Sequence, residues 1–368
     1  MLQHALASPV RRSRSGPAGT IVLALLLLLP ILAPAATPPV ATEAPAKPAA
    51  APKPIAYKPG PGPHVVAATR YDWMDGARHR AVPVKIYSPR GNGGPYPVIV
   101  FSHGLGGSRE GYEYLGRYWA TYGYVVVHVQ HPGSDDAVGK DQDKVKIGEA
   151  MRRALANPKT AVDRPADVRF VLDQLAALNR DEPTVKGKLD LDHVGMAGHS
   201  FGAWTTLILA GQLVVSPRGR EMSLADPRIK AALSMSAPVP RRRDQWDRVF
   251  QNVKIPCFHM TGTRDDSPVG DTAAPDRRVP FDRISPAGGG DQFLVTFSGG
   301  DHMVFSGRPR EAQGGEKDVS FQALIKMGSI AFWDAYLKRE FEARAWLARG
   351  GFAGVLGEDG AFEKKLKE

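Results

Sequence analysis

Cysteine is almost absent from this sequence. Cys257 is the only cysteine among 368 residues, so no intramolecular disulfide can stabilise the fold. It lies within the apolar run Ile255–Met260, which predicts a buried strand, and we therefore expect a packed core thiol. Spaced metal ligands such as a His-Glu-x-x-His motif are lacking as well. We predict neither a metal site nor a cofactor.

Apolar runs long enough to span a membrane are also lacking. The run Ile21–Leu32 has twelve residues and contains Pro30, whereas a membrane-spanning helix needs about 20. Arg11, Arg12 and Arg14 precede this run, and Ala33-Pro34-Ala35-Ala36 follows it. The order basic, apolar, small is typical of a secretory signal peptide. We expect residues 1–35 to be cleaved, leaving a secreted or periplasmic protein with no stable membrane span.

Basic charge is plentiful but not organised for nucleic acid. The formal net charge is +10, yet Lys and Arg are scattered, and Arg241-Arg242-Arg243 is the only tight cluster. No aromatic-interleaved motif or recognition helix accompanies them. We therefore predict a solvated surface and no nucleic-acid partner.

The rest of the chain divides by composition into a linker, one domain and a tail. Residues 36–65 are rich in Ala and Pro, which predicts an extended tether. Residues 66–345 alternate short β-rich runs with helix-like segments, which predicts an α/β domain with a mostly parallel sheet and helices on both faces. Residues 346–368 are expected to form a C-terminal tail. The segments 132–160 and 264–290 lack a regular pattern, so we expect long loops that shape a binding pocket.

The strongest motif is Gly198–Gly202, with the sequence Gly-His-Ser-Phe-Gly. It lies between a predicted strand, His193–Ala197, and a predicted helix, Phe201–Leu213. A serine on such a sharp strand-to-helix turn needs small neighbours two residues before and after it. This context predicts Ser200 as a nucleophile.

A glycine-rich loop, Phe101–Gly107, follows another predicted strand, Tyr96–Ser102. Such a loop can point a backbone N–H at a developing oxyanion, and the residue after the nucleophile supplies a second donor. We assign these donors to Leu105 and Phe201.

The base and the acid are sought downstream, because in this arrangement the triad runs Ser, acid, His along the chain. His302 is the histidine on a loop directly after the last predicted strand, Gln292–Phe297. The adjacent residues Asp265 and Asp266 follow the strand that ends near Met260. We favour Asp265 as the acid and keep Asp266 as the alternative, because the sequence does not show which side chain points inward.

Together, Phe101–Gly106 and Gly198–Gly202 resemble the platelet-activating-factor acetylhydrolase and bacterial dienelactone-hydrolase-like group of α/β-hydrolases, over roughly residues 70–340. The resemblance implies an α/β-hydrolase fold with about eight strands, hydrolysis of carboxylic esters, and oxyanion donors at Leu105 and Phe201. Dienelactone hydrolases use cysteine where Ser200 stands, so that activity is not expected.

We therefore expect a serine esterase that acts on a small or lipid-like ester through an acyl-enzyme. The alternatives are an amidase or peptidase with the same triad, a cutinase-like polyester hydrolase, and a non-catalytic binding module on this scaffold. The similar bacterial cutinases usually carry Met where Phe201 stands, and they have paired cysteines.

Overall fold

The computed structural model describes residues 55–140, 143–216, 218–308, 315 and 317–367. The expected signal peptide and most of the expected linker lie outside these residues. None of the helices in the described ranges has the length and apolar character that crossing a membrane requires.

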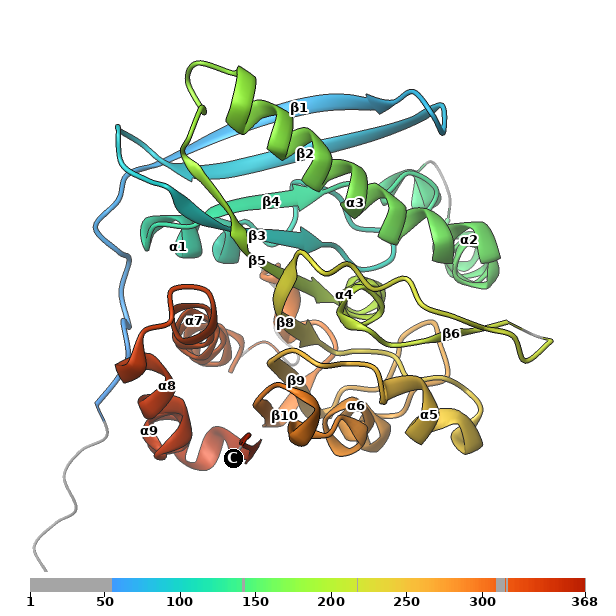
Figure 1. Cartoon of the computed structure of the whole chain (residues 1–368). Helices are drawn as coiled ribbons and strands as arrows, with labels where there is room; N and C mark the ends of the chain where they lie inside the picture. Colours follow the sequence, from blue (N-terminus) through green and yellow to red (C-terminus); the bar gives the residue numbers. More distant parts are fainter. Residues whose placement is uncertain (1–54, 141–142, 217, 309–314, 316, 368) are drawn as a thin grey trace, which may run out of the picture. The chain divides into compact units, whose positions relative to one another are not determined.

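A nine-stranded sheet forms the centre of the described domain, one strand more than the eight implied by the resemblance. Its order is β1-β2-β4-β3-β5-β8-β9-β10-β11, and neighbours from β4 to β10 are parallel while the outer strands are antiparallel (Figure 1). The strands of this sheet are β1 (Val66–Asp75), β2 (Arg80–Pro89), β3 (Tyr96–Ser102), β4 (Val125–Val129), β5 (Leu189–His199), β8 (Ile229–Met235), β9 (Cys257–Arg264), β10 (Gln292–Asp301) and β11 (Gly360–Lys365). A separate hairpin pairs β6 (Val214–Val215) with β7 (Glu221–Met222).

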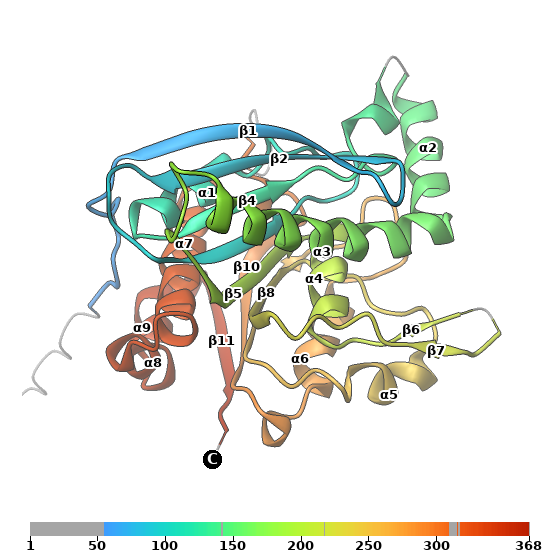
Figure 2. The same ribbon diagram turned by 45° about the horizontal axis from the view of Figure 1, so that its top comes forward.

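Helices cover both faces of the sheet, as the sequence pattern predicts (Figures 1 and 2). They are α1 (Glu113–Thr121), α2 (Lys144–Ala156), α3 (Pro158–Asp181), α4 (Phe201–Ala210), α5 (Trp246–Phe250), α6 (Val279–Arg283), α7 (Asp318–Tyr336), α8 (Phe341–Ala348) and α9 (Gly351–Leu356). Side chains of α1, α7 and α9 pack on one face, and those of α3, α4 and α5 pack on the other. This is the architecture of an α/β-hydrolase fold.

The continuous apolar runs of the central strands follow from this double covering. In β3, Ile99 and Phe101 belong to the core on the α1 and α7 side, while Val98 and Val100 belong to the core on the α3 side. Alternate side chains of a strand point to opposite faces, so both sets are apolar. Cys257 is buried beneath α4 and α5, and burial raises the pKa of its thiol to about 12.

Three segments differ from the sequence-based expectation. Residues 346–368, expected as a tail, include α9 and β11, and β11 completes the sheet beside β10. The segment 132–160 contains α2 rather than an unbroken loop. The end of the expected linker packs on the domain, because the Tyr57 hydroxyl donates to Asp334 at 3.0 Å.

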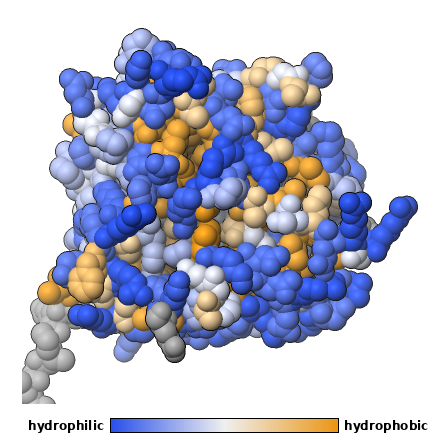
Figure 3. Space-filling view, viewed as in Figure 1, coloured by the Kyte–Doolittle hydropathy of each residue, from blue (hydrophilic) through white to orange (hydrophobic). Residues whose placement is uncertain are grey.

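Hydrophilic residues cover most of the face seen in Figure 3, with smaller apolar areas between them. The Arg241–Arg243 cluster is exposed, and its members pair with Asp271, Asp244 and Asp276. This cluster is therefore largely neutralised by local carboxylates, in keeping with a solvated surface.

Candidate active site

Ser200 occupies the sharp turn between β5 and α4. Its backbone has φ 56° and ψ −120°, a conformation that non-glycine residues seldom adopt. The turn is held by the Ser200 N–H, which donates to the Met235 carbonyl on β8 at 2.8 Å. The surrounding sheet thus holds a locally strained serine at the carboxyl end of β5.

The two motif glycines allow this turn because other backbone atoms pass very close to them. A Cβ added at Gly202 would lie 1.8 Å from the Ser102 carbonyl oxygen, and one added at Gly198 would lie 2.3 Å from the Gly202 oxygen. The first turn of α4 therefore packs directly on the end of β3. This contact brings Ser200 beside the glycine-rich loop Phe101–Gly107.

Ser200, His302 and Asp265 form one continuous hydrogen-bond chain. The Ser200 Oγ lies 2.9 Å from His302 Nε2, and His302 Nδ1 lies 2.8 Å from Asp265 Oδ1. Asp265 follows β9 and His302 follows β10, so the parallel strands deliver all three residues to the same edge of the sheet. Asp265 is fully buried and His302 is 7% exposed, while Ser200 is partly exposed.

The two adjacent aspartates have different surroundings. Asp265 Oδ2 accepts hydrogen bonds from the Ser236 hydroxyl and from Thr261 Oγ1, the latter at 2.8 Å. Asp266 instead accepts from the Ala274 N–H at 2.9 Å through Oδ1. The structure therefore places Asp265 against His302, while the carboxylate of Asp266 binds the backbone of the following loop.

Two further residues contact the Ser200–His302–Asp265 hydrogen-bond chain, and neither was predicted from the sequence. Arg277 is buried, and its guanidinium donates to the carbonyls of Asp265, at 3.0 Å, and Ser236, at 2.8 Å. Nε2 of His199 lies 3.0 Å from the carbonyl oxygen of His302. Burial, followed by the neighbouring His302 and then the positive charge of Arg277, lowers the pKa of His199 well below its usual value.

The sequence gives little sign of these supporting roles. Arg277 lies in the segment 264–290 that we expect to border the pocket, but Arg278 beside it is much more exposed, and no spacing distinguishes the two. His199 belongs to the Gly198–Gly202 motif, whose pattern indicates a turn and no contact with His302.

The backbone N–H groups of Leu105 and Phe201 are the oxyanion donors that the sequence analysis predicts. Phe201 is the first residue of α4, where the N–H has no partner inside its helix. Leu105 precedes Gly106, whose N–H donates to the Ser134 carbonyl at 2.9 Å. No residue in the described ranges accepts a hydrogen bond from the N–H of either Leu105 or Phe201. Both groups therefore remain able to bind a ligand.

Comparison with known proteins agrees with this fold. Residues 74–157 match the family model of platelet-activating factor acetylhydrolase, isoform II. The chain thus has an α/β-hydrolase fold and is similar in sequence to these enzymes. The matched part of the chain runs from the end of β1 through the glycine-rich loop and α1 to α2.

Three curated relatives, each named platelet-activating factor acetylhydrolase, match longer segments. The protein from Cavia porcellus is 31% identical over 153 residues, which are 34% of each chain. The protein from Canis lupus familiaris is 31% identical over 217 residues, which cover 50% of this chain and 43% of the relative. The protein from Bos taurus is 26% identical over 205 residues, which cover 47% of this chain and 41% of the relative. The matches thus span less than half of each relative.

Proposed function

We propose that this α/β-hydrolase cleaves carboxylic esters, with Ser200 as nucleophile, His302 as base and Asp265 as the acid that orients it. The continuous hydrogen-bond chain from Ser200 to Asp265 carries this proposal. The relatives named as acetylhydrolases support the reaction class.

The first half of the proposed reaction acylates Ser200. His302 Nε2 accepts the Ser200 hydroxyl proton while Oγ attacks the ester carbonyl carbon. The resulting imidazolium donates through Nδ1 to Asp265, whose other oxygen is already held by Ser236 and Thr261. The N–H groups of Leu105 and Phe201 bind the tetrahedral oxyanion. Collapse breaks the ester C–O bond, and His302 returns the proton to the departing alcohol.

The second half releases the acid. His302 Nε2 now accepts a proton from water, whose oxygen attacks the acyl-enzyme carbonyl. Collapse of the second tetrahedral intermediate releases the carboxylic acid, and the proton returns to Ser200 Oγ. The cycle needs no other reactant than ester and water.

For the substrate we propose a short acyl ester on a small or lipid-like alcohol. The relatives are named for removal of an acetyl group, and we propose the same acyl preference for this chain. We also propose secretion or export to the periplasm, from the basic, apolar and small-residue order of residues 1–35. The N-terminal sequence of the protein recovered outside the cytoplasm tests this location.

Hydrolysis of p-nitrophenyl esters from acetate to long acyl chains, by protein expressed from the full sequence, tests the reaction. The acetate should be among the best substrates, and Ser200→Ala should lower kcat by at least about 10⁴-fold. Ser320→Ala is the matched control, because Ser320 is exposed on α7 and bonds only a local carbonyl.

A parallel assay on matched p-nitroanilides distinguishes esters from amides. Faster anilide cleavage would replace the esterase proposal by an amidase. Absence of turnover on both series by folded protein would instead favour the non-catalytic alternative.

A further inference from the structure

A second Ser-His-Asp chain lies buried beneath the glycine-rich loop. His131 Nε2 lies 2.8 Å from Ser102 Oγ, and His131 Nδ1 lies 3.0 Å from Asp167 Oδ2. Ser102, at the end of β3, His131, after β4, and Asp167, on α3, are all fully buried. The spacing resembles that around Ser200, but Ser102 is fully buried and therefore inaccessible to a substrate.

The hydrogen-bond directions in this chain follow from Asp167. Burial opposes ionisation, but hydrogen bonds from His131 and Arg80 lower the pKa of Asp167 to about 2, so it is an acceptor only. Burial, together with the charge of Arg164, lowers the pKa of His131 to about 4, so the ring is neutral near pH 7. His131 therefore donates from Nδ1 to Asp167 and accepts at Nε2 from the Ser102 hydroxyl.

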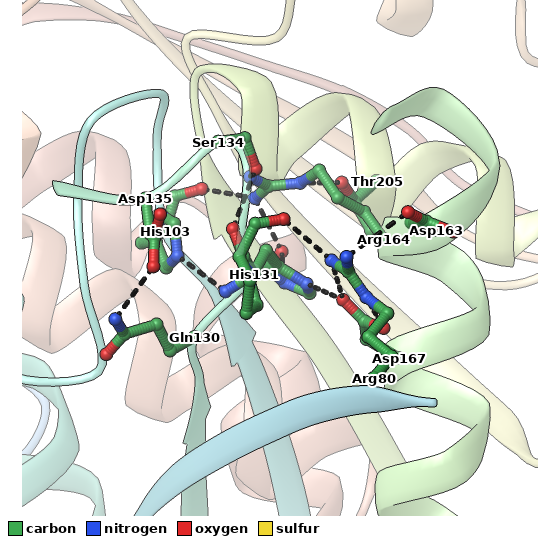
Figure 4. A network of polar contacts seen from close by, with 12 residues as sticks. Arg80, His103, Gln130, His131, Ser134, Asp135, Asp163, Arg164, Asp167 and Thr205 are labelled. Atoms are coloured by element: carbon green, nitrogen blue, oxygen red, sulfur yellow. Dashed lines mark hydrogen bonds and ion pairs between the residues drawn. The ribbon is translucent and has the colours of Figure 1, made fainter. Parts of the chain in front are cut away.

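Arg164 continues this chain and lies at its centre (Figure 4). Its guanidinium donates to Ser102 Oγ at 2.9 Å, Ser134 Oγ at 2.9 Å and Thr205 Oγ1 at 3.0 Å. A fourth hydrogen bond goes to the His103 carbonyl. Arg164 is fully buried, and no carboxylate of the described residues lies within 4 Å of it. Its direct partners are therefore hydroxyls and a carbonyl.

The partners of Arg164 belong to both halves of the predicted oxyanion hole. Ser102 and His103 begin the loop that contains Leu105, and the Ser134 carbonyl accepts the N–H of Gly106 at 2.9 Å. Thr205 lies on α4, and the guanidinium carbon of Arg164 lies 4.7 Å from the centre of the Phe201 ring. One side chain thus binds the elements that carry both proposed N–H donors.

We propose that Arg164 is a positioning residue that sets the distance between the Leu105 and Phe201 N–H groups. The Ser102–His131–Asp167 chain orients it, because the Ser102 hydroxyl proton is committed to His131 and leaves its oxygen lone pairs to Arg164. This inference rests on the proposed esterase function. A lysine cannot replace the arginine, because its single nitrogen cannot reach acceptors on β3, on the loop after β4 and on α4 together.

The inference is tested with Arg164→Lys in the full chain, using p-nitrophenyl acetate. We expect kcat to fall about 100-fold, because a small misplacement of catalytic groups has effects of this size. KM should stay within about twofold, because the loss is confined to the transition state. The inhibition constant of a trifluoromethyl ketone, whose adduct with Ser200 carries the same oxyanion, should rise in proportion.

Two further variants keep the result interpretable. Arg169→Lys is the matched control, because Arg169 lies on the same helix α3 and donates to the Leu224 carbonyl at 2.6 Å, outside the network. It should retain wild-type kcat. Thr205→Val removes one Arg164 acceptor at nearly constant shape. It should lower kcat by a smaller factor, again with little change in KM and a proportional rise in the inhibition constant. This variant tests the positioning role if Arg164→Lys shows no cooperative melting.

The outcomes separate this inference from the proposed function. An inactive wild-type chain would refute the esterase proposal and with it the role of Arg164. An active wild type with folded Arg164→Lys at unchanged kcat would overturn only the positioning role. So would a loss of activity that leaves the trifluoromethyl ketone inhibition constant unchanged.

Discussion

Single residues with unusual backbone conformations gather around Ser200. Among the described non-glycine residues with positive φ are Tyr112, Ser200 and Ser236, at φ 60°, 56° and 55°. The Tyr112 hydroxyl lies 2.8 Å from His199 Nδ1, and the Ser236 hydroxyl donates to Asp265. Each conformation costs on the order of 1–3 kcal/mol, so contacts with the surrounding structure must stabilise all three. Such clustering is typical of functional sites.

The two neighbouring aspartates allow a sharp test at this scale. Asp265→Asn should lower kcat on p-nitrophenyl acetate by about 10⁴-fold, because an amide at this position favours the wrong imidazole tautomer. Asp266→Asn should stay near the wild-type rate, since its oxygen can still accept from the Ala274 N–H. Equal losses in both variants, or a larger loss in Asp266→Asn, would reverse the assignment. Steady-state kinetics with melting curves for each variant provide the measurement.

The sequence predicted the site unevenly at this scale, for physical reasons. Ser200 and His302 stand in strand-to-loop contexts whose geometry is local, and the structure brings them together. The choice between Asp265 and Asp266 depends on Ser236, which is distant in sequence. Arg164 carries no local signal at all, because its burial arises from three elements that meet only in the folded chain.

Whole elements were predictable where both of their faces are covered. The sequence pattern places the strand at β3 with the observed bounds, because its apolar run is nearly continuous. β1 and β11 were missed because they are outer strands with many exposed positions, which weakens the pattern. In β11, Phe362 stacks on Phe293 of β10, so the strand depends on a neighbour about 70 residues earlier.

Helix α2 lies beside the proposed oxyanion loop. A Cβ added at Gly106 would lie 2.6 Å from the Met151 methyl group, so this side chain contacts the loop directly. Met151→Ala should raise kcat/KM for p-nitrophenyl octanoate relative to acetate several-fold, because it opens space for about 2 to 3 further methylene groups. The ratio of the two kcat/KM values, measured on one preparation, gives the result.

Arg153→Ala on the same helix is the matched control, because Arg153 is exposed. It should leave the ratio unchanged. The same ratio in Met151→Ala and wild type would mean that α2 does not border the acyl group. A fall in melting temperature without a change in the ratio would assign Met151 to packing alone.

Six of the nine histidines in the described part of the chain are buried. Five of them, His103, His128, His131, His199 and His259, are buried and have lowered pKa values. Burial is the largest cause in each, and it lowers the pKa of His128, His131 and His259 to about 4. The folded chain therefore holds these rings neutral at a pH where the unfolded chain would protonate them.

Stability should therefore fall steeply in mild acid. Above about pH 6.5 the rings are neutral in both states, so their contribution is fully present. Below that pH the unfolded state binds more protons, and each buried ring removes about 1.4 kcal/mol per pH unit until its folded pKa is reached. Because domains are stable by only about 5–15 kcal/mol, we expect unfolding to begin below about pH 5.5. Urea titrations between pH 5.5 and 7.5 measure the slope.

A histidine variant far from Ser200 isolates this effect from the chemistry of the site. His259 lies inside β9 and bonds Ser234 Oγ at 2.9 Å, so His259→Gln should lower the slope by about one proton, or 1.4 kcal/mol per pH unit. His79→Asn is the control, because His79 is exposed in the turn between β1 and β2. A slope in His259→Gln equal to that of wild type would show that the acid sensitivity comes from other groups. The His79→Asn control retains every buried histidine ring. A smaller slope in His259→Gln than in this control can therefore be assigned to the burial of His259.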